Sequence, residues 1–332
     1  MTIYLEGGLN SMKLTRTLSL ATFLTLLAGC VQNPGDTMNL KQHSGPVKVQ
    51  SNGQSPADLT EGRHIVPIQN LQNTGYVSLD DLAQATGYHG AWLRDGTYGV
   101  GDYDAAWLFK TGDSTVTVAN NKVEMPASAI KDNNHLYIPV AALQKLFGDV
   151  TVFTVEPDDV AFFPKPSPNE TGANGRNLDF ADARPTKPAL AADSEGIMNA
   201  ASEDSRMIAF AKKFLGIKYE FGTGAYKQTG TFDCSSFTRY VFDQFDVDLP
   251  RIARAQAEKG HYVDRDKLEV GDLLFFYVPG RFKSNETVGH VGIYMGNGNM
   301  IHASPKPQDG VQITPINKAY WKDTFLYAKR YL

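Results

Sequence analysis

The sequence has few of the residues that build metal, nucleotide or nucleic-acid sites. It has only two cysteines in 332 residues, and it lacks the spaced cysteines and histidines typical of zinc sites. No glycine-rich loop ends in Lys-Ser or Lys-Thr, which excludes the common phosphate-binding loop. The net charge is −4, so we expect no nucleic-acid partner. If the protein is catalytic, we therefore expect side chains to carry out the catalysis, without a cofactor.

Long hydrophobic runs are also missing. The longest candidate, residues 18–28, follows Lys13 and Arg16 and is shorter than the roughly 20 apolar residues that span a bilayer. Its length suits the core of a secretory signal. The run closes on Leu-Ala-Gly before Cys30, which resembles the bacterial lipobox. That resemblance implies cleavage after residue 29 and a lipid anchor on Cys30.

Three alternatives concern this amino-terminal segment. Glu6 precedes the basic pair, so Met12 is an alternative start. Cys30 could be an ordinary buried cysteine, but polar residues with proline and glycine follow it at once. A disulfide between Cys30 and Cys234 is disfavoured because residues 31–62 are typical of a flexible tether.

Two linkers divide the chain. Residues 30–62 and 164–201 are rich in proline, glycine, serine and asparagine and lack hydrophobic periodicity. We therefore predict a signal peptide at 1–29, a tether at 30–62, a first domain at 63–163 and a second domain at 202–332, each domain near the usual size.

The first domain contains an internal repeat. Residues 76–87 match residues 137–148, and each copy predicts a short strand, a helix and a glycine stop. Strand-like pieces lie between them at 107–109 and 115–118. The pattern resembles the copper-amine-oxidase-like stalk domain, whose name implies neither copper nor oxidase activity. We expect a wall adaptor or spacer here. Its histidines lack metal-ligand spacing and are expected to lie at the surface or to have their hydrogen bonds satisfied by protein groups: His64, His89 and His135.

Cys234 stands at the start of a predicted helix. After Asp233, apolar residues recur at 237, 240, 241 and 245, the stripe of an amphipathic helix. Asp233 is the predicted N-cap, so Cys234 occupies the first turn. The helix dipole and unpaired amides there lower the pKa of a thiol, and we expect a reactive thiolate.

A thiolate nucleophile needs a base, and three histidines follow Cys234. His290 and His302 lie in two alternating segments joined by a glycine-rich turn, whereas His261 lies in a polar stretch and is expected to be exposed. Two histidines on neighbouring strands, facing a cysteine on a helix, supply a base and an orienting residue.

The second domain resembles the NlpC-type cysteine peptidases of bacterial cell walls. Six segments carry the resemblance in order: Tyr219 in KYEFGTG, FDCSSF, LPRIARAQ, GDLLFFY, GHVGIYMGNG and MIHAS. The resemblance implies an α+β, papain-like fold in which the helix bearing the cysteine packs on an antiparallel sheet. A small α+β repeat domain precedes it.

The same resemblance implies the roles of the site residues. Cys234 is the nucleophile, His290 the general base and His302 the polar third residue. Tyr219, Asp233 and Ser235 line the substrate pocket. The implied substrate is the peptidoglycan stem peptide, cut at the γ-D-glutamyl bond to the diamino acid. Together with the lipobox, this predicts a secreted lipoprotein on the outer face of the membrane.

Some residues depart from the family pattern. Ser236 stands where glycine is usual, and Ile252 and Ala253 replace an Asp-Ser pair that in some members holds a free substrate amine. A strict preference for a free L-Ala terminus is therefore not expected. Arg251, Gln256 and Asp272 are expected to be structural. An N-acetylmuramoyl-L-alanine amidase, a thiol acyltransferase and a catalytically silent wall-binding lipoprotein remain alternatives.

Strand pairing makes the histidine assignment testable. A three-residue loop at 296–298, or an equivalent bulge, sets His302 opposite Gly292 and on the same sheet face as His290. A two- or four-residue loop without a bulge moves His302 to the other face. We predict the first arrangement, with both rings pointing at the helix of Cys234.

Overall fold

The computed structural model describes residues 63–119, 121–163, 203–281 and 283–332. The predicted signal, Cys30, the tether and the whole of the second linker lie outside these residues. In the described residues no helix is both long and apolar enough to cross a membrane.

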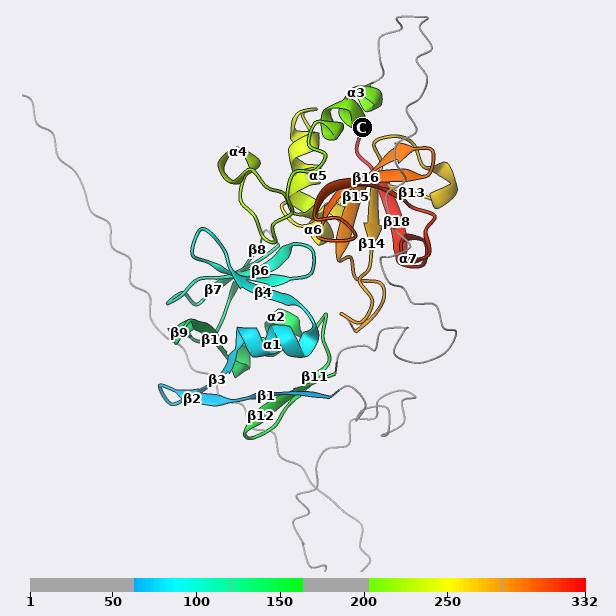
Figure 1. Ribbon diagram of the computed structural model, residues 1–332. Coiled ribbons are helices and arrows are strands. Elements are labelled where there is room, and N and C mark those ends of the chain that lie inside the picture. Colours follow the sequence, from blue (N-terminus) through cyan, green and yellow to red (C-terminus); the bar gives the residue numbers. More distant parts are fainter. Residues whose placement is uncertain (1–62, 120, 164–202, 282) are drawn as a thin grey trace, which may run out of the picture. The chain divides into compact units, whose positions relative to one another are not determined.

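The first folded region is rich in short strands (Figure 1). Its elements are β1 (His64–Pro67), β2 (Gln69–Leu71), β3 (Thr74–Ser78), α1 (Leu79–Thr86), β4 (His89–Trp92), β5 (Tyr98–Gly101), β6 (Ala105–Phe109), β7 (Thr115–Val118), β8 (Asn121–Glu124), β9 (Ile130–Asp132), β10 (His135–Pro139), η1 (Val140–Ala142), α2 (Leu143–Phe147), β11 (Phe153–Val155) and β12 (Asp159–Phe162). They form three sheets, with orders β1-β12-β11, β2-β3-β10-β9 and β4-β5-β6-β7-β8.

The predicted repeat is confirmed. Each copy is a strand followed by a helix, β3 with α1 and β10 with η1 and α2, and the two strands pair antiparallel. Ser78 caps α1 by accepting from the backbone N–H of Asp81. Gly87 ends α1 in the left-handed conformation, which glycine adopts without strain.

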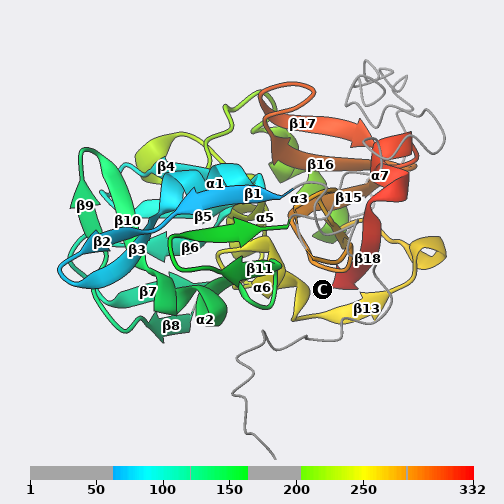
Figure 2. The same cartoon turned by 90° about the horizontal axis from the view of Figure 1, so that it is seen from below.

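The second region contains the predicted cysteine helix and one larger sheet (Figures 1 and 2). Its elements are α3 (Glu203–Lys212), α4 (Tyr226–Thr229), α5 (Cys234–Asp243), α6 (Ala253–Ala257), β13 (His261–Val263), η3 (Arg265–Lys267), β14 (Leu273–Phe276), β15 (His290–Gly296), β16 (Asn299–Ser304), β17 (Gly310–Pro315), α7 (Ala319–Asp323) and β18 (Phe325–Arg330). The six strands run in the order β13-β18-β14-β15-β16-β17. All their pairings are antiparallel, and α5 packs on β15 and β16. The predicted α+β class is therefore confirmed.

Three hydrophobic cores fill the described parts of these regions: one surrounds Trp321 within the second region, and each of the other two takes in residues of the other region. The first core gathers most buried residues between 66 and 162 and also includes Ile252 and Ala255. The second lies under α3 and α5 and includes Tyr103. The predicted domain boundaries stay predictions, but the two regions are in direct contact.

Candidate active site

Helix α5 begins at Cys234, as predicted. The Asp233 side chain accepts from the backbone N–H of Ser236 at 2.8 Å, and the backbone N–H of Asp233 donates to the Ser236 hydroxyl at 2.9 Å. This reciprocal capping box fixes the first turn of the helix. Ser236, which departs from the usual glycine, is therefore part of the cap. The Cys234 side chain is fully buried.

The predicted hairpin geometry brings the two histidines together. Strands β15 and β16 pair Ile293 with Ile301, so His302 lies across from Gly292, on the face of His290. The turn has two residues rather than three, and a bulge between Tyr294 and Gly296 restores the register. A Cβ added to Gly292 would lie 2.9 Å from the sulfur of Met300 and 3.2 Å from the Cβ of His302, so glycine makes room for these two side chains.

One part of that prediction is wrong: the rings do not lie on the sheet face that α5 covers. Because side chains alternate along a strand, the residues packed under α5 are the neighbours of the histidines: Val291, Ile293, Ile301 and Ala303. His290 and His302 lie on the opposite face, with ring centroids 5.3 and 5.1 Å from that of Trp321. The backbone of Val291, which follows His290 in β15, lowers the pKa of the Cys234 thiol, but burial outweighs this effect.

The two imidazoles form a buried chain of hydrogen bonds. Nε2 of His290 lies 2.8 Å from Nδ1 of His302, and Nε2 of His302 lies 2.9 Å from Oγ1 of Thr314 on β17. Among the described residues, Nδ1 of His290 has no hydrogen-bond partner. If that nitrogen is the proton acceptor, then His290 carries its proton on Nε2 and donates to His302. His302 then carries its own proton on Nε2 and donates to Thr314.

Both rings are neutral near pH 7. Burial, followed by the neighbouring His302, lowers the pKa of His290 well below its ordinary value. Burial lowers the pKa of His302 to about 3. A neutral His290 is able to accept a proton.

The predicted low pKa of the thiol is wrong for this structure. Burial raises the pKa of Cys234 well above its ordinary value, and the carboxylates of Asp104 and Asp233 raise it further. The capping position of Cys234 is present, but the desolvation of a fully buried sulfur outweighs the helix dipole. In this arrangement Cys234 is a thiol.

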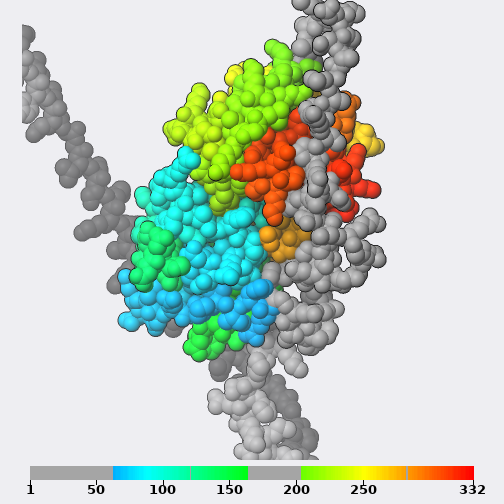
Figure 3. All heavy atoms as spheres, in the orientation of Figure 1, coloured from blue at the N-terminus to red at the C-terminus, as the bar shows by residue number. Residues whose placement is uncertain are grey.

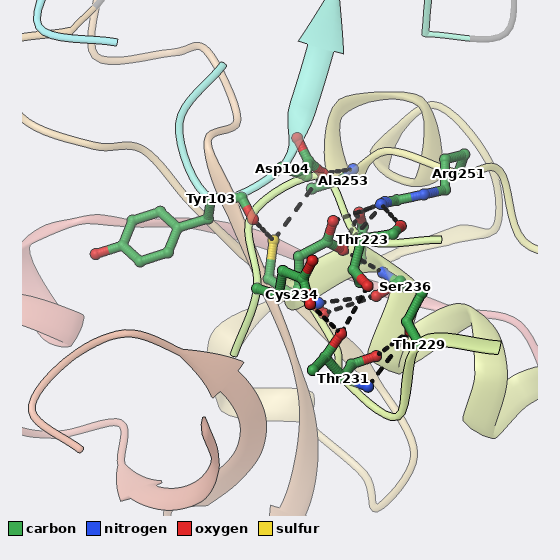
Figure 4. A network of polar contacts seen from close by, with 12 residues as sticks. Tyr103, Asp104, Thr223, Thr229, Thr231, Cys234, Ser236, Arg251 and Ala253 are labelled. Atoms are coloured by element: carbon green, nitrogen blue, oxygen red, sulfur yellow. Dashed lines mark hydrogen bonds and ion pairs between the residues drawn. The ribbon is translucent and has the colours of Figure 1, made fainter. Parts of the chain in front are cut away.

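Residues of the first region cover Cys234 (Figure 4). The Cys234 thiol donates to the backbone carbonyl of Tyr103 at 3.4 Å, and its sulfur lies 4.0 Å from the Asp104 carboxylate. The Tyr103 ring centroid lies 4.4 Å from that of His290. The loop between β5 and β6 thus touches both the cysteine and a histidine, which the prediction of a spacer domain did not anticipate.

The predicted pocket residues lie beside Cys234. The Tyr219 hydroxyl donates to the same Tyr103 carbonyl, at 3.1 Å. Asp233 and Ser235 are fully buried, and both accept hydrogen bonds from Arg251. Arg251 also forms a 2.5 Å ion pair with Asp233. Their role in binding substrate stays a prediction.

The remaining predicted residues lie where the sequence indicated. Gln256 holds α6 to α5 through Thr238 and the Ser235 carbonyl, and Asp272 pairs with Arg330. Both contacts are structural. The histidines predicted at the surface are exposed: His64, His89, His135 and His261. Over the described ranges, no group of acidic, cysteine and histidine side chains is arranged to hold a metal ion.

Sequence reasoning missed three residues at this site. Thr314 lies two residues beyond Gln312, the strand partner of His302, so alternation would have indicated it once the register of β17 was known. Tyr103 and Asp104 are more than 120 residues away from Cys234 in the chain. They had no sequence signal beyond a polar turn.

Both regions are similar to known protein families. Residues 216–330 match the NlpC/P60 family, and residues 60–152 match the copper amine oxidase N-terminal domain. The "Gamma-D-glutamyl-L-lysine dipeptidyl-peptidase" of Bacillus cereus is 36% identical over 127 residues, which are 38% of this chain and 36% of that protein. The "Murein DD-endopeptidase MepS/Murein LD-carboxypeptidase" of Escherichia coli is 34% identical over 139 residues, 42% of this chain and 68% of that protein. The "Gamma-DL-glutamyl hydrolase" of Bacillus subtilis is 34% identical over 135 residues, 40% of this chain and 31% of that protein. The chain thus spans only about a third of two of these relatives.

Proposed function

Because this chain belongs to the NlpC/P60 family, we propose that it is a cysteine peptidase that hydrolyses peptidoglycan stem peptides. The observation that carries the proposal is the hydrogen-bonded pair of His290 and His302 on β15 and β16, the two strands on which the helix of Cys234 packs. A nucleophile at a helix start, a base and an orienting residue are the parts that acyl transfer needs.

The proposed bond is the one between the γ-carboxyl of D-glutamate and the diamino acid. Two of the similar proteins carry a γ-glutamyl specificity in their names. The Escherichia coli relative is named for other murein bonds, so the choice of bond rests on analogy. An N-acetylmuramoyl-L-alanine amidase and a thiol acyltransferase use the same residues. A catalytically silent wall-binding lipoprotein is disfavoured because the cysteine and both histidines are present.

In the proposed mechanism the Cys234 sulfur attacks the scissile carbonyl carbon, and His290 takes the thiol proton at Nδ1. His290 then gives that proton to the leaving amine and later activates water. The backbone N–H of Cys234 and the Tyr219 hydroxyl stabilise the oxyanion. The Tyr219 donation to the Tyr103 carbonyl supports this role, because the thiol contacts the same oxygen. His302 and Thr314 hold the proton of His290 on Nε2.

We also propose that the mature protein begins at a lipidated Cys30 and lies on the outer face of the membrane, towards the wall. The lipobox-like sequence supports this proposal. Two acyl chains anchor a protein stably, whereas one gives reversible binding.

Analysis of the products tests the choice of bond. Soluble muropeptides are incubated with the full chain, and the fragments are identified by mass spectrometry. The proposal predicts a new amino terminus on the diamino acid and a terminal D-glutamate. Release of intact stem peptides from the sugar would instead identify an amidase.

A further inference from the structure

The contact of the β5–β6 loop with Cys234 has the geometry of a bound peptide. The Tyr103 carbonyl oxygen receives hydrogen bonds from the Cys234 thiol and from the Tyr219 hydroxyl, at 3.4 and 3.1 Å. A scissile carbonyl oxygen also lies near the nucleophilic sulfur and an oxyanion donor. The Tyr103 carbonyl oxygen therefore takes up two hydrogen-bond donors that a substrate carbonyl would meet at this site.

The loop also closes the site to solvent. Cys234 and His302 are 0% exposed and His290 is 1% exposed. The Tyr103 ring lies on His290, and Tyr103 belongs to the hydrophobic core under α5. A reagent or substrate cannot reach the sulfur while this ring and carbonyl stay in place.

Asp104 holds the β5–β6 loop to helix α6. Its carboxylate accepts from the backbone N–H of Ala253 at 2.7 Å, the first residue of α6. The same carboxylate raises the pKa of Cys234 and so keeps the sulfur protonated. The loop therefore covers the Cys234 sulfur and, by keeping it protonated, lowers its nucleophilicity.

Two ion pairs outside the site hold the regions together. Arg281 meets Asp102 at 3.2 Å, and Arg94 meets Glu220 at 2.6 Å. Figure 3 shows cyan atoms of the first region next to yellow-green atoms of the second, and the Arg94–Glu220 pair joins these two regions. Arg281 and Arg94 are 36% and 59% exposed, whereas Asp102 is buried, so opening the loop also moves Asp102 and Tyr103 out of buried positions.

A cleft of substrate size lies next to the covered cysteine. It has a volume of about 730 Å³ and is lined from both regions, with Trp92 and Arg94 on one side and Glu220 and Arg251 on the other. Ala105, which follows Asp104, lines it, but Cys234 does not. The space available to a peptide therefore ends at the loop.

We propose that residues 102–104 are an internal plug, with the Tyr103 carbonyl in the place of the scissile carbonyl, and that the plug must leave before a stem peptide reaches Cys234. This inference rests on the proposed function for the identity of the substrate. The accessibility of the Cys234 sulfur can be measured without any substrate.

The test is the rate at which iodoacetamide alkylates Cys234 in the full chain, followed by mass spectrometry of its peptide. The opened variant is Arg281→Ala with Arg94→Ala, and Asp102→Asn is a milder variant that keeps the size of the side chain. Asp158→Ala is the matched control, because Asp158 is an exposed carboxylate of the same region. Circular dichroism verifies that each variant is folded.

If the loop is closed, Cys234 is alkylated slowly in the wild type and in Asp158→Ala. We expect the wild type to populate the open state at about 0.1–10% and the opened variant to populate it fully. Cys234 of the opened variant is then alkylated roughly 10- to 1,000-fold faster than Cys234 of the wild type. Hydrolysis of soluble muropeptides rises with alkylation. The proposal is contradicted if Cys234 of the wild type is alkylated as fast as Cys234 of the opened variant and of the urea-unfolded protein.

Two combinations of alkylation and hydrolysis results distinguish a failure of the plug proposal from a failure of the proposed function. If alkylation rises but no variant hydrolyses any muropeptide, the plug stands and the proposed function fails. If alkylation rises while muropeptide hydrolysis falls, the loop is a working part of the substrate site and the plug is refuted.

Discussion

Thr314→Val tests the hydrogen-bond chain behind His290. Valine has nearly the shape of threonine but cannot accept the proton of His302 Nε2, which lies 2.9 Å from Oγ1 and is fully buried. A buried donor left without an acceptor costs about 1–3 kcal/mol. If that loss falls on the transition state, kcat decreases roughly 5- to 150-fold. His302 is then free to take the other tautomer, which removes the acceptor for His290.

The assay is hydrolysis of a soluble muropeptide as a function of pH, with thermal unfolding measured in parallel. Thr314→Ser keeps the hydroxyl and should restore most of the activity. Thr324→Val is the control for stability alone, because Thr324 is equally buried and donates to the Tyr320 carbonyl. Unchanged kcat in Thr314→Val, or equal losses in Thr314→Val and Thr324→Val, would refute the reasoning.

Three further predictions concern the anchor, the thiol and the helix cap. Cys30→Ala should release the protein from membranes in a high-salt wash, and retention of the variant would refute the lipid anchor. Asp104→Asn removes a carboxylate that raises the pKa of Cys234, so the midpoint of Cys234 alkylation against pH should move to lower pH; an unchanged or higher midpoint contradicts the assigned cause. Asp233→Ala leaves the charge of Arg251 without its buried partner and removes the N-cap, so we expect a loss of about 3–5 kcal/mol in denaturant unfolding, and a loss below about 1 kcal/mol contradicts it.

The local elements of the site could be predicted from the sequence. The polar residues before an apolar stripe predicted the start of α5 at Cys234, and the two-residue period predicted the shared face of His290 and His302. The exact turn could not be predicted, because a bulge and a longer loop give the same register. Both patterns depend on residues near each other in the chain.

The surroundings of the cysteine could not be predicted in the same way. The direction of the thiol pKa depends on burial and on Asp104, which tertiary packing brings to Cys234 from a distant region. The sheet face that α5 covers likewise depends on how the helix packs on the sheet. Side-chain alternation predicts that His290 and His302 share a face, but not which face the helix covers.

The central claim is that Cys234 carries out hydrolysis of the stem peptide. It is tested most directly by incubating soluble muropeptides with the wild type, Cys234→Ala and Cys30→Ala at equal concentrations and counting the new termini by mass spectrometry. We expect γ-D-glutamyl cleavage by the wild type and Cys30→Ala, and none by Cys234→Ala. Equal cleavage by Cys234→Ala and the wild type would contradict it.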